Sequence, residues 1–89
     1  MVRLTYLQCH SLLRNGKRTK DANIDRTTWN VFRRVPPMEL WGLQNHRKGD
    51  FLINQIYLFI RIHANEPNLI ARQLYVLRLH IEIKVPKLV

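Results

Sequence analysis

The stretch that most constrains the fold is residues 74–85, with the sequence LYVLRLHIEIKV. From Leu77 to Val85 every second side chain is aliphatic, and the side chains between them are polar or charged. A period of two residues is typical of a β-strand that is buried on one face. A helix would spread the same aliphatic residues around its circumference. We therefore predict a strand over residues 74–85 and expect the rest of the chain to supply a partner strand and a cover.

A second strongly apolar segment covers residues 51–63, with the sequence FLINQIYLFIRIH. Its second half also alternates, with Leu58, Ile60 and Ile62 on one side. The content of β-branched and aromatic residues favours a strand. A nearly continuous apolar run is also compatible with a buried helix, because periodicity alone does not separate the two. We predict a strand here and keep the helix as the alternative.

Residues 64–73 join the two predicted strands. The tripeptide Glu66-Pro67-Asn68 is a turn signal, while Asn65 offers an alternative as the cap of a single helical turn with Pro67 near its start. A connection of this length exceeds a tight hairpin loop, so we expect an antiparallel pair with a structured connection.

The N-terminal segment predicts a helix over residues 2–14. Leu4 and Leu7 have helical spacing, and two leucines near the end of the segment widen the apolar stripe. Gly16 follows, and glycine readily takes the left-handed conformation that ends a helix. We expect this helix to cover one face of the sheet.

The middle of the chain, residues 15–50, is basic and irregular. Residues 27–35 are predicted to form a short helix, because Trp29 and Phe32 lie three residues apart. A strand is the alternative, since the segment is rich in β-branched and aromatic residues. Pro36-Pro37 ends either structure, because proline restricts both itself and the residue before it.

Two shorter features complete the middle of the chain. Pro37 can open a helical turn over residues 38–42, and residues 44–50 carry turn residues and a basic cluster. The apolar side chains here are Met38, Leu40, Trp41 and Leu43, of which Met38 and Trp41 are the candidate interface residues. We expect them either to cover the end of the sheet or to form an exposed protein interface, where such residues are favoured.

Together these elements predict a single small α+β domain over residues 1–89, with an N-terminal helix and short middle helices packed on a small antiparallel C-terminal β-sheet. Two strands rarely form a stable sheet in isolation. The middle segment must then add a strand, or another chain must pair with the edge formed by residues 74–85. A homodimer formed by strand addition is one such arrangement.

The charge of the chain is strongly positive and unevenly distributed. The net charge is +9, and ten of the fifteen basic residues are arginine. Residues 1–48 carry ten basic and three acidic side chains, whereas residues 49–89 carry five and three. Such a surface favours a polyanionic partner, and nucleic acid is the commonest one. The candidate nucleic-acid-binding residues are Arg14, Lys17, Arg18, Lys20, Arg33, Arg34, Arg47, Lys48, Arg61, Arg78 and Lys84.

The polar face of the predicted strand pair has the composition of a surface that binds single-stranded RNA. Tyr57, Phe59 and Arg61 from one strand would lie beside Arg78 and Lys84 from the other. Aromatic rings stack on unpaired bases, and cations hold the phosphate backbone. Burial of Phe59 in the core is the competing interpretation, given the size of its ring.

Several classes of function lack a signal in the sequence. There is no glycine-rich phosphate loop, no nucleophile motif and no pair of metal ligands at a characteristic spacing, so we predict no enzyme, no catalytic residue, no metal and no cofactor. Cys9 is the only cysteine, which favours a reducing, intracellular compartment. We expect a cytoplasmic protein. The acid-poor, arginine-containing first twenty residues make a mitochondrial address the alternative.

The sequence therefore predicts a small, basic, non-enzymatic protein that binds RNA or a ribonucleoprotein surface through its arginine and lysine clusters. The alternative is a structural or regulatory protein-interaction module, which would dimerise or bind a partner through the sheet edge and apolar anchors. No run of apolar residues is long enough to span a membrane, so no transmembrane segment is expected.

Overall fold

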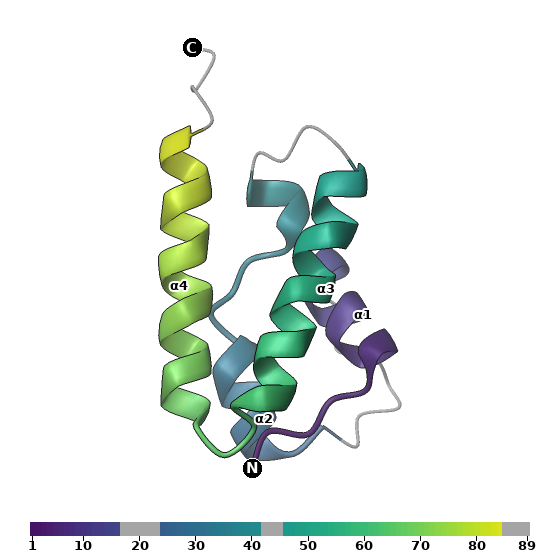
Figure 1. The fold of residues 1–89 in the computed structure, drawn as a ribbon, viewed down its shortest axis with the longest axis vertical. Coiled ribbons are helices and arrows are strands. Elements are labelled where there is room, and N and C mark those ends of the chain that lie inside the picture. The colour runs from purple at the N-terminus through teal and green to yellow at the C-terminus, as the bar shows by residue number, and fades with distance from the viewer. Residues whose placement is uncertain (17–23, 42–45, 85–89) are drawn as a thin grey trace.

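A computed structural model of the 89-residue chain describes residues 1–16, 24–41 and 46–84, and these residues form helices and connecting segments. The elements, in order, are α1 (Tyr6–Asn15), α2 (Arg26–Phe32), the 3₁₀ helix η1 (Met38–Trp41), α3 (His46–Ile62) and α4 (Pro67–Lys84). In Figure 1, α3 and α4 run side by side in opposite directions, joined by a short turn. Helix α1 packs on α3, and α2 packs on α4.

The predicted α+β fold is wrong, because the described residues contain no strand. Residues 51–63 and 74–85 were predicted as a strand pair. Residues 51–62 instead lie in α3 and residues 74–84 in α4, while residue 63 lies in the turn after α3 and residue 85 falls outside the described residues. For residues 51–63 the helical alternative is the one observed. The sheet edge on which a strand-paired dimer would depend is therefore missing from the described part of the chain.

The helical stripe of α4 begins before the alternating segment. Ile70 and Leu74 are buried, and Leu77 packs against the same core. These residues are four and three positions apart, which is the spacing of one helical face. Val76 and Leu79 lie outside the stripe and are exposed. The alternating aliphatic residues from Leu77 onward are therefore compatible with a helix when the segment considered begins at Ile70.

Helix α3 buries a stripe with the same spacing. Ile53, Ile56 and Ile60 are buried in the core, while Phe51 and Leu58 are exposed. The predicted turn over residues 44–50 is wrong where it can be tested, because residues 46–50 form the start of α3, whereas 44 and 45 fall outside the described residues.

Proline marks the start of α4. Pro67 is its first residue, a position where the missing amide hydrogen breaks no helical hydrogen bond. The Ile70 amide donates to the Glu66 carbonyl at 3.1 Å, which closes the first turn. The Glu66 amide in turn donates to the His63 carbonyl at 2.8 Å. The tight turn between α3 and α4 thus replaces the longer connection that was predicted.

Helix α1 starts four residues later than predicted and ends one residue later, at Asn15. Thr5 and Gln8 form a reciprocal capping box, so the helix begins at Tyr6 and not at residue 2. At the other end Gly16 has φ of 62°, and its amide donates to the Leu12 carbonyl at 3.1 Å. A side chain at this position would be strained by the backbone conformation, and its Cβ would also lie 2.8 Å from Cγ of Pro37.

The helix predicted within residues 27–35 is confirmed as α2, and the strand alternative is wrong. Asp25 caps α2 by accepting a hydrogen bond from the Thr28 amide at 2.7 Å. The short helical turn expected after Pro37 is present as η1.

The buried side chains of all five elements meet in one core. The largest fully buried side chains include Trp41, Leu13, Met38, Ile53 and Ile60. Among the described residues, no helix is long and apolar enough to cross a membrane.

Two leucines of α4 test this arrangement. Leu74 is 3% exposed and Leu79 is 39% exposed. We expect Leu74→Ala to lower the free energy of unfolding by about 2–5 kcal/mol, because it leaves a cavity in the core. Leu79→Ala should change it by only about 0.5 kcal/mol. Urea denaturation of both variants measures the difference, and equal losses would contradict the helical register.

Candidate nucleic-acid interface

Three of the predicted nucleic-acid-binding arginines converge beside α2 and α4. Arg33 and Arg34 follow α2 directly, and Arg78 lies in α4. All three residues line the same two neighbouring cavities. We call Arg33, Arg34 and Arg78 the arginine cluster. Figure 1 shows why distant residues can meet here, since α2 and the chain that follows it lie next to α4.

The local sequence places the first two arginines at the end of a helix. Arg33 caps α2, and its amide donates to the Trp29 carbonyl at 2.8 Å. Pro36 and Pro37 prevent the helix from continuing. The indole nitrogen of Trp41 donates to the Pro36 carbonyl at 2.7 Å and so holds this segment against the core. Cations suit this position, because the carbonyl end of a helix carries partial negative charge.

The two cavities have volumes of about 460 and 350 Å³. Both values lie within the range of small-molecule sites, about 300–1,000 Å³. Trp29 lines the larger cavity, and Tyr75 lines the smaller one. Among the described residues that line either cavity there is no carboxylate. The arginine cluster thus lines both cavities, and each cavity is also lined by an aromatic residue.

Other predicted cations lie away from this cluster. Arg47 and Lys48 are exposed in the first turn of α3, and Arg61 is exposed in its last turn. The Arg61 guanidinium lies over the Tyr57 ring, 5.9 Å from its centroid. These three residues therefore occupy the two ends of α3 and do not line the arginine-cluster cavities.

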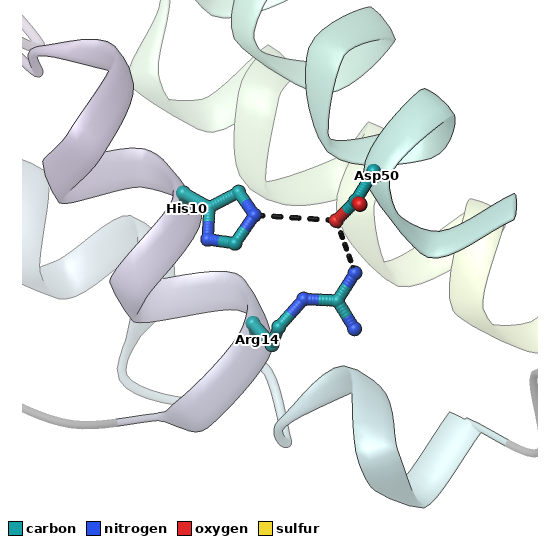
Figure 2. Close-up of polar contacts among 3 residues, drawn as sticks. All are labelled: His10, Arg14 and Asp50. Carbon is teal, nitrogen blue, oxygen red and sulfur yellow. Dashed lines mark hydrogen bonds and ion pairs between the residues drawn. The ribbon is translucent and has the colours of Figure 1, made fainter. Parts of the chain in front are cut away.

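Arg14 binds a carboxylate within the protein. Figure 2 shows His10 and Arg14 of α1 converging on Asp50 of α3. The Arg14 guanidinium donates to the Asp50 carboxylate, and Nε2 of His10 lies 3.3 Å from the same oxygen. The absence of a side chain at Gly49 allows the guanidinium to approach α3 closely, since a Cβ there would lie 2.9 Å from it. Arg14 therefore links two helices, with its side chain only 15% exposed.

The ionisation of Asp50 reflects these contacts. The hydrogen bond from Arg14, followed by that from His10, holds the pKa of the Asp50 carboxyl below its ordinary value of 3.8. Asp25 behaves similarly at the start of α2, where the Thr28 amide lowers its pKa. Both carboxylates are exposed, so solvent screens these interactions.

Four of the predicted cations cannot be placed. Lys17, Arg18 and Lys20 lie outside the described residues, as does the side chain of Lys84. Their expected contribution to nucleic-acid binding stays a prediction.

The structure places Met38 and Trp41 in the core and not at an interface. Their exposed fractions are 2% and 1%. The short helix η1 contacts α1 and α4, and its third apolar side chain, Leu40, is exposed. Neither expected role is observed, because the described residues contain no sheet for Met38 and Trp41 to cover and their burial in the helical core leaves them no exposed surface for a partner.

The aromatic and cationic face predicted for the strand pair is not formed. Successive helical residues point about 100° apart, so residues two apart in sequence face different directions. The Tyr57 ring packs edge-on against Tyr6 of α1, with centroids 5.4 Å apart. Phe59 instead lies against the groove between α3 and α4. The prediction failed because its register belonged to a strand.

Cys9 and the histidines offer no metal centre in the described part of the chain. No group of three or more potential ligands comes together among those residues. Burial raises the pKa of the Cys9 thiol to about 12, which keeps it protonated and unreactive.

Sequence reasoning missed Trp29, Tyr75 and Asn30 as parts of the site. If both segments are taken as helices, the spacing indicates which residues lie near the arginines: Trp29 and Arg33 are four residues apart, and Tyr75 and Arg78 are three apart. Such pairs share a helical face. Asn30 carries no comparable signal, and only the packing of α2 on α4 brings it to the smaller cavity.

Comparisons with protein-family models, with characterised proteins and with solved structures found no match to this chain.

The stabilisation that the Asp50 carboxylate provides should depend on pH. A carboxyl whose pKa is lowered by folding stabilises the protein above the unfolded pKa, and this contribution is lost as pH falls through the folded value. We expect Asp50→Asn to be less stable than the parent at pH 6, and the gap to close as pH falls below 3.8. Thermal denaturation at a series of pH values measures the gap.

A double-mutant cycle with Arg14→Met supplies the control. If Arg14 and Asp50 act as a pair, the double variant should lose less stability at pH 6 than the sum of the two single variants. A stability gap that is independent of pH would contradict the assignment.

Proposed function

We propose that this protein binds RNA without catalysis, and that the arginine cluster is the centre of the binding surface. The observation that carries the proposal is the convergence of Arg33, Arg34 and Arg78 on two aromatic-lined cavities, the first two from the segment directly after α2 and the third from α4. Arginine suits phosphate because its planar guanidinium donates two parallel hydrogen bonds.

The wider charge distribution supports the same partner. A net charge of +9 favours encounter with a polyanion, whichever surface makes the final contact. Arg33 and Arg34 are exposed, whereas Arg14 is engaged by Asp50. Arg33 and Arg34 therefore present cations to solvent beside the two cavities, and the half-buried Arg78 lines the same cavities.

The proposed mechanism is neutralisation of phosphates with release of their counterions. For single strands each neutralised phosphate contributes about 0.7 to the slope of log affinity against log salt concentration. Affinity should therefore fall steeply with salt, and each phosphate-binding arginine that is removed should flatten this dependence.

The test is a fluorescence-anisotropy titration of single-stranded RNA between about 50 and 300 mM salt. We expect the triple variant Arg33→Ala, Arg34→Ala, Arg78→Ala to bind more weakly and to lower the salt slope by about 2, which corresponds to three lost phosphate contacts. Because Arg78 is partly buried, the double variant that retains it should also be measured, with an expected slope change of about 1.4.

A matched control removes three cations elsewhere. Substituting Arg47, Lys48 and Arg61 by alanine changes the net charge by the same amount but leaves the arginine cluster intact. The control should retain most of the affinity. An equal loss in both triple variants would mean that binding is diffuse, and no binding at about 50 mM salt would overturn the proposal.

A second candidate function is protein–protein interaction, which the solvent face of α3 favours. Phe51, Leu58 and Ile62 are exposed, and spacings of seven and four residues place them on one helical face. With Arg47 and Arg61 on the same helix, the partner that fits this face is an acidic amphipathic helix. Replacing the three apolar residues by serine should spare RNA binding if the main proposal holds. Loss of RNA binding in this folded variant would instead place the RNA-binding surface on α3.

A further inference from the structure

The smaller of the two cavities combines an apolar floor with a polar rim. Val31 and Leu74 are buried at its floor, and Ala71 is half-buried beside them. The floor therefore comes from α2 and α4 together, and it exists only while these helices are packed. With a volume of about 350 Å³, the cavity is large enough to hold a small planar group.

Tyr75 supplies an aromatic wall to this cavity. Its side chain is 59% exposed, although it lies beside a buried part of α4. An exposed tyrosine at a concave surface offers a flat ring that can stack on another ring and loses little conformational entropy when it does so. Trp29, at the larger cavity, instead packs against the core and is partly buried.

The rim of the cavity carries the groups that would hold the rest of a nucleotide. Arg34 and Arg78 line it, and Arg78 follows Tyr75 by three residues on the same face of α4. Asn30 also lines it from α2, and its amide offers both a donor and an acceptor to the edge of a base. The aromatic residue Tyr75, the two arginines and Asn30 therefore line one cavity.

We propose that this cavity receives one unpaired nucleotide of an RNA strand, with the base stacked on Tyr75 and the adjoining phosphate held by Arg34 and Arg78. The inference rests on the proposed RNA-binding function and narrows it to single strands. A paired base is already stacked within its helix, so a duplex can offer its phosphates to the arginines but no free ring to Tyr75.

The experiment compares RNA probes that share a backbone but differ in their bases. A single strand of about eight nucleotides, an abasic strand of equal length and a duplex are titrated against the full chain at several salt concentrations between about 50 and 300 mM. The parent protein should bind the base-bearing single strand about 5- to 150-fold more tightly than the abasic strand, the range that stacking of one base provides.

Variants of Tyr75 separate stacking from charge. Tyr75→Leu keeps an apolar side chain but removes the ring, so it should abolish the preference for base-bearing RNA and leave the salt slope unchanged. Tyr75→Phe should retain the preference. Phe51→Leu is the matched control, because it removes an exposed ring from α3 and should have no effect.

The outcomes distinguish this inference from the function on which it rests. If all three probes bind equally, or if Tyr75→Leu keeps the full preference, the nucleotide pocket is wrong while RNA binding by the arginine cluster stands. If no probe binds, both proposals fail. A preference for single strands that disappears with Tyr75→Leu and returns with Tyr75→Phe supports the pocket.

Discussion

The burial of the α4 stripe is the interaction on which the rest of the structure depends. Ile70 and Leu74 carry α4 into the core, where it meets α2, α3 and η1. Burying a leucine or isoleucine side chain contributes about 1.5–3 kcal/mol, which is a large share of the stability expected for a small domain. Because Arg78 follows Leu74 by one helical turn, the packing that stabilises α4 also carries Arg78 to the end of α2.

The basic residues of the chain occupy two different environments in this arrangement. Arg14 joins α1 to α3 through Asp50, so one cation is part of the internal framework. Arg33 and Arg34 remain exposed at the end of α2, where two prolines and the hydrogen bond from Trp41 fix the following segment. Residues of the same charge thus differ in their contacts according to their place in the fold, and net charge alone cannot distinguish them.

Local signals in the sequence predicted part of the fold. Gly16 correctly marked the end of α1, and the spacing of Trp29 and Phe32 correctly indicated α2. The strand pair was wrong because two periods coincide in a short window: Leu77 and Ile81 belong both to an alternating pattern and to the helical series that starts at Ile70. Only part of the candidate site could be predicted from the sequence. The arginines could be identified there, but their convergence depends on the packing of α2 against α4.

The most direct measurement is NMR chemical-shift mapping of the isotopically labelled chain during titration with a short single-stranded RNA. If the arginine cluster binds RNA, the amide shifts should concentrate at residues 29–35 and 71–78, the two segments that line its cavities. The start and end of α3, which also carry exposed cations, should change little. Shifts of equal size at Arg47, Lys48 and Arg61 would show that RNA binds to exposed cations without a defined site. That result would contradict binding at the arginine cluster.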